Sequence, residues 1–275
     1  MTDQETGATA QPTDAPVAGG APTMPLFYKA PQPVNARRHA KLGVRRDADL
    51  GFAATTNVLP IGLGEFAVAA RHYPLVFAAE APHMPVAICG LRNGENVFVT
   101  AGRQWVPDAY VPAYVRRYPF VFMEAQDGKQ MILCVDEDSG LVSEGGDLPL
   151  FDADGKRTEV VERAVEFCRM YHQQHQATRQ FVEALAGQGL LTDNTTEIRL
   201  PENRKIELKG YMIVDRAKFD ALDDAVFLDW RKRGWLAAIY YHLQSGSNWG
   251  TVMRHVVERG QEKAAAEAEA AKPKS

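Results

Sequence analysis

The sequence predicts an α+β fold: a mainly antiparallel sheet built from two helix-strand-strand repeats, followed by a long helix and a C-terminal helical segment. The first observation is an internal repeat, because residues 71–77 recur 45 positions later as residues 116–122 with the shared pattern Arg-x-Tyr-Pro-x-Val-Phe. The second is that short apolar runs flank the turn pairs Asn93-Gly94 and Asp127-Gly128, which favour hairpins over crossover helices. The third is that apolar residues beyond residue 158 recur with the period of a helix.

Each repeat is expected to begin with a short amphipathic helix that ends near Tyr-Pro. Proline has no N–H to donate and clashes with the preceding turn, so the helices are predicted over 62–73 and 111–118. The first repeat (64–91) and the second (109–136) are expected to continue with strands at 75–78, 85–91, 120–124 and 130–136, and a further strand is expected at 96–100. Cys89 and Cys134 share the 45-residue offset, which predicts that the second strands are also equivalent.

The second half, residues 157–260, is expected to be rich in helix. Thr158 is predicted to cap a long helix that reaches about Ala186. One stripe of this helix is expected to pack on the sheet, and it contains Ala164, Phe167, Cys168, Tyr171, His175, Thr178, Val182 and Leu185. Strands at 197–200 and 205–214 should follow, and Asp215 should begin a run of helices that includes 236–243 and 249–258.

The chain is expected to form one domain over residues 24–260. Residues 1–23 and 261–275 have too little apolar surface to offset the entropy of ordering, so they are predicted to be disordered or frayed tails. A net charge of −4 gives no electrostatic reason to expect nucleic acid as a partner. An odd number of cysteines, no signal-peptide pattern and no apolar run of bilayer length predict a soluble, cytoplasmic protein without a membrane span.

Two groups of side chains are candidates for chemistry. Cys168, His172 and His175 would share one face of a helix and offer a thiolate and two imidazoles to a metal, but a fourth ligand is missing and the same residues suit a core stripe, so no metal is predicted. Asp136, Glu137 and Asp138 end a strand and could divide acid and base roles, or Asp138 could simply begin the turn that follows. No cofactor is expected, because the sequence has no Gly-rich phosphate loop, nucleophile elbow or Cys-x-x-Cys pair.

The segment 105–120 is the candidate ligand-binding region. It combines aromatic residues, prolines and two arginines, which are the residue types that supply contact area and directional hydrogen bonds at recognition surfaces. Tyr110 and Tyr114 lie one helical turn apart, so core packing explains part of the pattern. The residues expected to line a groove are Trp105, Tyr110, Arg116, Arg117 and Tyr118.

The same segment, together with several other short motifs, resembles the bacterial SapC family over about residues 25–243. The motifs are Glu65-Phe66, Tyr73-Pro74, Phe77, Gly90-Leu91, Asn96, Tyr110-Val111-Pro112-Ala113, Arg116-Arg117-Tyr118-Pro119-Phe120, Asp136-Glu137-Asp138, Leu150-Phe151-Asp152, Gly155 and Gly210-Tyr211-Met212-Ile213-Val214-Asp215. The resemblance implies a link to surface-layer systems of pathogenic bacteria, to outer-membrane nutrient receptors or to flavin-dependent halogenases. It implies no catalytic residues.

These observations lead to one main functional prediction and two alternatives. The main prediction is a non-catalytic binding or accessory protein that recognises a peptide or protein partner through the aromatic and arginine surface of the second repeat. The first alternative is an enzyme that acts on a small anionic substrate with Asp136, Glu137 or Asp138 as acid and base and an arginine such as Arg116 as anchor. The second alternative is an exported surface-layer or envelope component.

Overall fold

The computed structural model describes residues 24–47, 49–125, 130–199 and 205–270. The predicted tail 1–23, the predicted turn at Asp127-Gly128 and residues 271–275 lie outside the described residues. Within them, helices and antiparallel sheets form the predicted α+β fold, with a long helix and further helices after the repeats.

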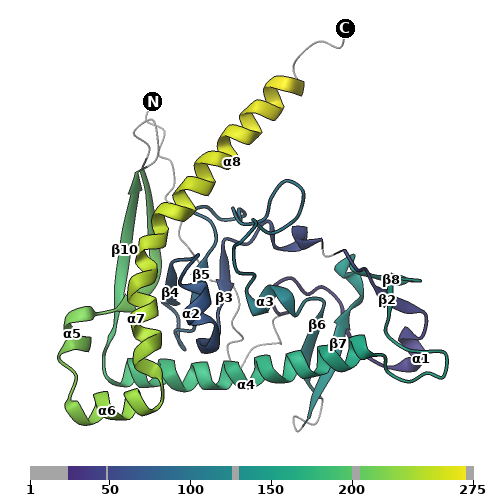
Figure 1. Cartoon of the computed structure of the whole chain (residues 1–275), viewed down its shortest axis with the longest axis horizontal. Coiled ribbons are helices and arrows are strands. Elements are labelled where there is room, and N and C mark those ends of the chain that lie inside the picture. The colour runs from purple at the N-terminus through teal and green to yellow at the C-terminus, as the bar shows by residue number, and fades with distance from the viewer. Residues whose placement is uncertain (1–23, 48, 126–129, 200–204, 271–275) are drawn as a thin grey trace.

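The larger sheet has five strands in the order β10-β11-β4-β5-β3, and every pair of neighbours is antiparallel. Its strands in chain order are β3 (Val58–Pro60), β4 (Leu75–Ala78), β5 (Pro85–Ile88), β10 (Leu191–Arg199) and β11 (Lys205–Val214). In Figure 1 the β10–β11 hairpin extends well beyond the short strands beside it.

Two three-stranded sheets complete the β-structure. The first has the order β1-β7-β6 and consists of β1 (Pro31–Pro33), β6 (Phe120–Glu124) and β7 (Met131–Asp136). The second has the order β8-β2-β9 and consists of β2 (Leu42–Val44), β8 (Val142–Glu144) and β9 (Leu148–Pro149).

The two repeats share one topology. The hairpin β4–β5 receives β3 on its second strand, and the hairpin β6–β7 receives β1 on its second strand, in both cases antiparallel and from an earlier part of the chain. The hairpin registers differ, because Leu75 pairs with Ala87 whereas Phe120, 45 residues after Leu75, pairs with Val135, 48 residues after Ala87. The predicted equivalence of Cys89 and Cys134 is therefore wrong, although the equivalence of the first strands is confirmed.

The helix before each Tyr-Pro is shorter than predicted. The first repeat has η2 (Leu63–Glu65) followed by α2 (Phe66–Ala69), and the second has only α3 (Ala113–Arg116). Both tyrosines are buried and lie between the short helix and the first strand of their hairpin. The remaining short helices are α1 (Ala36–His39), η1 (Leu50–Ala53) and η3 (Glu137–Ser139).

The long helix α4 (Glu159–Gly187) runs along both repeats (Figure 1). Its C-terminal half contributes Phe181, Val182 and Leu185 to the core of the larger sheet, and its N-terminal half contributes Val161 and Cys168 to the core beneath β6 and β7. The predicted stripe is confirmed, since all its members are buried or half-buried. The two repeats are therefore held by one continuous helix.

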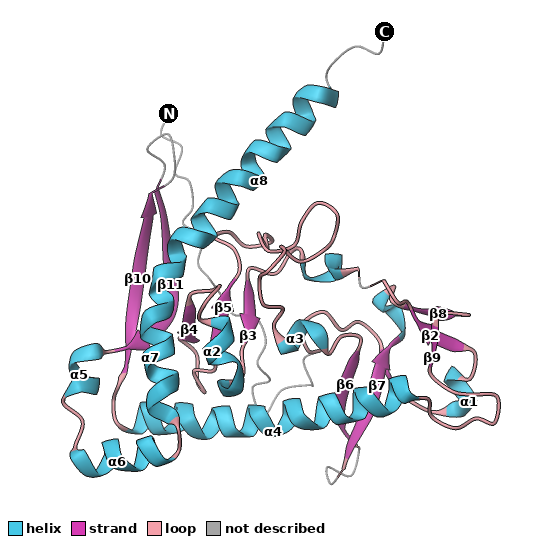
Figure 2. Cartoon of the chain, in the orientation of Figure 1, coloured by secondary structure: helices cyan, strands magenta, loops and turns pink. Residues whose placement is uncertain are grey.

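Four helices after β11 close the larger sheet (Figure 2). They are α5 (Arg216–Asp220), α6 (Asp224–Lys232), α7 (Trp235–Ser245) and α8 (Trp249–Ala270), with η5 (Gly246–Asn248) between the last two. Asp215 caps α5 as predicted, because its side chain accepts hydrogen bonds from the backbone of Ala217 and Lys218. The helical backbone of α8 continues ten residues beyond the domain end predicted at 260.

The buried His242 connects α7 to the sheet. Its Nε2 accepts a hydrogen bond from the backbone N–H of Val214 at 3.0 Å, and its Nδ1 donates to the carbonyl of Leu75 at 2.9 Å. Val214 ends β11 and Leu75 begins β4. One imidazole thus satisfies two backbone groups in the core, and this arrangement requires the neutral ring.

Two local predictions fail. Residues 96–100 form no strand, and only an isolated bridge joins Val99 to Trp105. The carbonyls of Asn96 and Val99 instead accept hydrogen bonds from Arg259 of α8. Thr158 precedes α4, but its hydroxyl donates to the carbonyl of Pro149 at 2.6 Å and makes no capping hydrogen bond.

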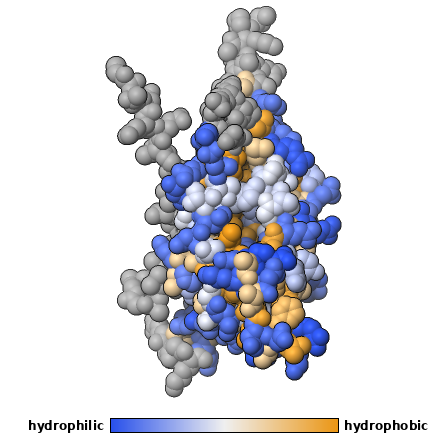
Figure 3. All heavy atoms as spheres, turned by 90° about the vertical axis from the view of Figure 1, so that its left-hand side faces the viewer, coloured by the Kyte–Doolittle hydropathy of each residue, from blue (hydrophilic) through white to orange (hydrophobic). Residues whose placement is uncertain are grey.

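The side of the molecule that carries α5 and α6 is mainly hydrophilic (Figure 3). Hydrophobic side chains appear there in small groups among polar ones, as on ordinary protein surfaces. Among the described residues, every helix is too short or too polar to cross a bilayer.

Candidate binding site at the junction of the two repeats

The helix α3 places the two arginines of the second repeat against α4. The guanidinium of Arg116 lies 5.3 Å from the ring centroid of Phe167, and that of Arg117 lies 4.4 Å from the ring centroid of Tyr171. Phe167 and Tyr171 are one helical turn apart on α4, so both contacts fall on one face of that helix. The two predicted arginines therefore occupy one site on α4.

Glu65 of the first repeat binds the start of α3 in the second. Its Oε1 accepts hydrogen bonds from the hydroxyl of Tyr110 at 2.9 Å and from the backbone N–H of Ala113 at 2.7 Å. Its Oε2 accepts a hydrogen bond from the backbone N–H of Gly62 at 2.8 Å. Because Ala113 is the first residue of α3, this carboxylate caps that helix and fixes it relative to η2.

Arg116 is exposed but firmly oriented. Its Nε donates to the carbonyl of Val111 at 3.0 Å, and its Nη2 donates to the Tyr110 hydroxyl at 2.9 Å. Burial, with the Glu65 carboxylate as second cause, raises the pKa of Tyr110 to about 12, so this hydroxyl stays protonated. No carboxylate in the described part of the chain forms an ion pair with Arg116, and its charge is presented to solvent.

Arg117 lies inside a cage of three tyrosine rings. Its guanidinium is 4.1 Å from the ring centroid of Tyr114, 4.4 Å from that of Tyr171 and 5.5 Å from that of Tyr28. The Nε atom is enclosed and has no hydrogen-bond partner. Cation–π attraction offsets part of the cost of removing this charge from water.

Two of the five residues predicted to line the groove belong to the core. Trp105 is 8% exposed, and its indole N–H donates to the hydroxyl of Tyr73 at 2.9 Å. Tyr118 is 7% exposed, and its hydroxyl donates to Asp136 at 3.0 Å. Both side chains are buried, so the candidate site is narrowed to Tyr110, Arg116 and Arg117 with the α4 residues Phe167 and Tyr171.

The three consecutive acidic residues do not meet in one place. Asp136 is fully buried and accepts hydrogen bonds from the backbone of Lys29 at 3.0 Å and Ala30 at 2.8 Å, so it ties the segment just before β1 to the second repeat. Glu137 binds Arg38 through two hydrogen bonds of 2.5 and 2.6 Å, and these lower the pKa of Glu137. Asp138 is exposed.

The three candidate metal ligands, Cys168, His172 and His175, differ in burial and in contacts. Burial raises the pKa of the Cys168 thiol to about 11, and burial lowers the pKa of His175. His172 contacts Gln176 at 2.9 Å. Across the described ranges, no group of three His, Cys, Asp or Glu side chains is arranged to hold a metal ion.

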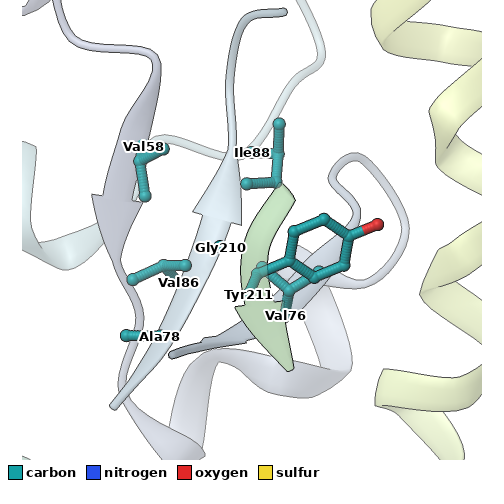
Figure 4. A pocket seen from close by; sticks show the side chains of 7 residues that line it. All are labelled: Val58, Val76, Ala78, Val86, Ile88, Gly210 and Tyr211. Carbon is teal, nitrogen blue, oxygen red and sulfur yellow. The ribbon is translucent and has the colours of Figure 1, made fainter. Parts of the chain in front are cut away.

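Two hollows lie elsewhere in the described structure. Figure 4 shows the first, where side chains from β3, β4, β5 and β11 surround a cavity of about 10 Å³, enough for one water molecule. Its one polar side chain, Tyr211, already bonds Asn194 at 3.0 Å. The second has a volume of about 340 Å³ and lies between α2 and α7, lined in part by Arg71, Tyr241 and Gln244.

Sequence reasoning identified the arginines and missed most of their partners. Glu65 lies 48 residues before Ala113 and Tyr171 lies 54 residues after Arg117, so no local pattern connects them. Phe167 and Tyr171 were placed in the apolar stripe of α4, where an aromatic residue that contacts a cation cannot be distinguished from a core residue. The only sequence signal for this site was the pair of adjacent arginines, Arg116 and Arg117, among aromatic residues.

Comparison with known proteins adds the family. A family model described as SapC matches residues 34–252, a region that contains Glu65, both arginines and the whole of α4. The comparisons with curated proteins and with solved structures gave no match. The match covers most of the chain and confirms the resemblance seen in its motifs, and we conclude that the chain belongs to the SapC family.

Proposed function

We propose that this protein is a non-catalytic accessory protein that recognises an acidic peptide segment of a protein partner through the surface formed by Tyr110, Arg116 and Phe167. The observation that carries the proposal is the state of Arg116, which is exposed, held by two hydrogen bonds and not in a direct ion pair with any carboxylate of the described residues. A preorganised arginine between aromatic rings loses little side-chain entropy when it binds a partner carboxylate.

The charge balance supports an acidic ligand. The chain carries a net charge of −4, yet Arg116 and Arg117 stand next to each other without an ion pair among the described residues. Two adjacent uncompensated cations on an otherwise acidic protein create a local positive potential. Such a patch favours ligands that carry carboxylates.

The enzyme alternative has less support. General acid–base catalysis requires groups that reach one substrate. Asp136 is fully enclosed by its hydrogen-bond donors, Glu137 is bound to Arg38, and Asp138 faces solvent, so the three carboxylates do not line a common cavity.

We further propose that the protein acts in the cytoplasm. Cys89, Cys134 and Cys168 are all buried and free, which suits a reducing compartment. Cell fractionation with an antibody against the protein tests this point, and recovery from the envelope or the medium would favour the surface-layer alternative.

The binding proposal is tested with a displayed library of random peptides selected on the immobilised full-length protein. We expect selected peptides to be enriched in Asp and Glu, and the Kd of the best peptide to rise at least tenfold in Arg116→Ala. Arg169→Ala is the matched control, because Arg169 is an exposed arginine on α4 that is already paired with Glu166 at 2.6 Å. Enrichment without acidic residues, or equal binding by Arg116→Ala, would refute the proposal.

A further inference from the structure

The most unusual side chain in the molecule is Arg117. An arginine has five N–H donors and no acceptor, and it stays charged at every physiological pH. Among the described residues no carboxylate pairs with it, and none of its side-chain donors has a protein acceptor within hydrogen-bond distance. A largely buried charge without a counter-ion costs free energy of folding, so a functional reason for this arginine is expected.

The surroundings of Arg117 are built from three separate segments. Tyr28 comes from the segment before β1, Tyr114 from α3 and Tyr171 from α4. Two of these rings are fixed by their own hydroxyls, since Tyr28 donates to the carbonyl of Phe120 at 2.5 Å and Tyr114 donates to that of Leu26 at 3.3 Å. The cage therefore holds the guanidinium in one position without using its donors.

The terminal nitrogens of Arg117 are unpartnered among the described residues. The Nε atom of Arg117 is completely enclosed, whereas the two terminal nitrogens are not, and the side chain as a whole is half-buried. The hydroxyl of the half-buried Tyr171 likewise has no hydrogen-bond partner among the described residues and is not completely enclosed. Arg116 adds a second positive charge at the next position of the chain.

We propose that Arg117 is an oxyanion-binding residue whose terminal nitrogens bind a carboxylate of the partner, with the Tyr171 hydroxyl as a second donor. This inference rests on the proposed function, and it adds the more buried arginine of the same site as a second contact for the partner. A guanidinium presents two parallel N–H groups that match the two oxygens of a carboxylate. The aromatic walls exclude water and strengthen that pairing.

The experiment uses the full chain labelled with 15N-arginine. The Nε–H signal of Arg117 is followed by NMR while glutarate is added at constant ionic strength, and a parallel titration uses inorganic phosphate. We expect a saturable shift of the Arg117 signal with glutarate, and a Kd at least fivefold higher in Tyr171→Phe. An unmoved Arg117 signal at high glutarate overturns the proposal, as does a shift with phosphate alone, which would assign the site to a phosphate group.

A second measurement uses variants. Glutarate should raise the Tm of the wild type and of Arg169→Met, and should leave the Tm of Arg117→Met unchanged. An equal rise in Arg117→Met overturns the proposal. The wild-type NMR titration remains decisive if Arg117→Met does not fold.

The two hypotheses fail differently. If the selected acidic peptides bind wild type and Arg117→Met equally while Arg116→Ala weakens them, Arg117 is not the oxyanion site and the proposed function stands. If no acidic peptide is selected but glutarate still moves the Arg117 signal, the peptide proposal fails and the oxyanion site stands.

Discussion

His242 should make the stability of this protein depend on pH between about 4 and 6.5. Burial lowers the pKa of His242 from 6.5 to about 4, because the enclosed site disfavours the charged ring, and the hydrogen bond to the Leu75 carbonyl opposes this shift only in part. The folded pKa lies below the unfolded value, so the unfolded chain binds the proton first as the pH falls. The contribution of His242 is therefore fully present above pH 6.5 and is lost as the pH falls toward 4.

The size of the effect follows from the two pKa values. Between pH 7.5 and pH 5 the unfolded state gains a proton that the folded state still excludes, which reduces the free energy of unfolding by about 2 kcal/mol. His242→Gln keeps an acceptor and a donor but cannot titrate. The variant should therefore lack this part of the pH dependence, although its stability at pH 7.5 is expected to be lower.

The assay is urea unfolding followed by tryptophan fluorescence, for wild type and His242→Gln at pH 7.5 and pH 5. Other titrating groups, including His175, whose pKa burial also lowers, act in both proteins and cancel in the difference. We expect the stability difference between wild type and variant to shrink by about 2 kcal/mol at pH 5. A difference that stays constant between the two pH values would show that the reasoning on His242 is wrong.

Four further substitutions test the packing and the links between the repeats, each by urea unfolding at neutral pH. Gly90→Ala should cost about 3 kcal/mol, because a Cβ would lie 1.9 Å from the carbonyl oxygen of Glu95; a loss below about 0.5 kcal/mol would contradict this close contact. Gly250→Ala is its matched control in α8, where no atom lies within 4 Å of the added Cβ, and it should stabilise by up to about 1 kcal/mol; a clear loss would be inconsistent with an open site. Glu65→Gln should cost about 2 kcal/mol, since an amide replaces the carboxylate that accepts three hydrogen bonds at the junction; unchanged stability would show that Glu65 does not hold the repeats together. Asp136→Asn should cost about 2 kcal/mol, because one amide oxygen cannot replace both carboxylate oxygens, which bind Tyr118 and the backbone just before β1; wild-type stability would argue against this tie.

The parts of the fold that sequence predicted well are those with local signals. The strands β4 and β6 occupy the predicted residues 75–78 and 120–124, because Tyr-Pro ends the helix before each of them. The strands β1 and β3 were missed, since each has three residues, ends in proline and pairs only with a distant hairpin. The run 96–100 is apolar because it is buried, and its carbonyls bond Arg259 instead of a neighbouring strand.

In the candidate site, too, local sequence signals predicted some residues, and contacts between distant segments determined the rest. Arg116 and Arg117 were identified from composition, because arginine next to aromatic residues is typical of recognition surfaces. Their environments depend on contacts between segments far apart in sequence: Glu65 with the start of α3, and Tyr171 with Arg117. Trp105 and Tyr118 have the same residue types as a binding surface, and only their burial shows that they serve the core.

The repeat itself suggests how the site arose. Arg71 and His72 stand 45 residues before Arg116 and Arg117, at equivalent places ahead of the first strand of each hairpin. Burial, and then the charge of Arg71, lower the pKa of the half-buried His72, which favours its neutral form. An arginine has no neutral form at physiological pH, so the second copy must either surround Arg117 with aromatic rings or supply an anion. It supplies the rings, and under the proposal above the anion comes from a ligand, so the proposed binding site belongs to the second copy, which carries a permanent charge at this position.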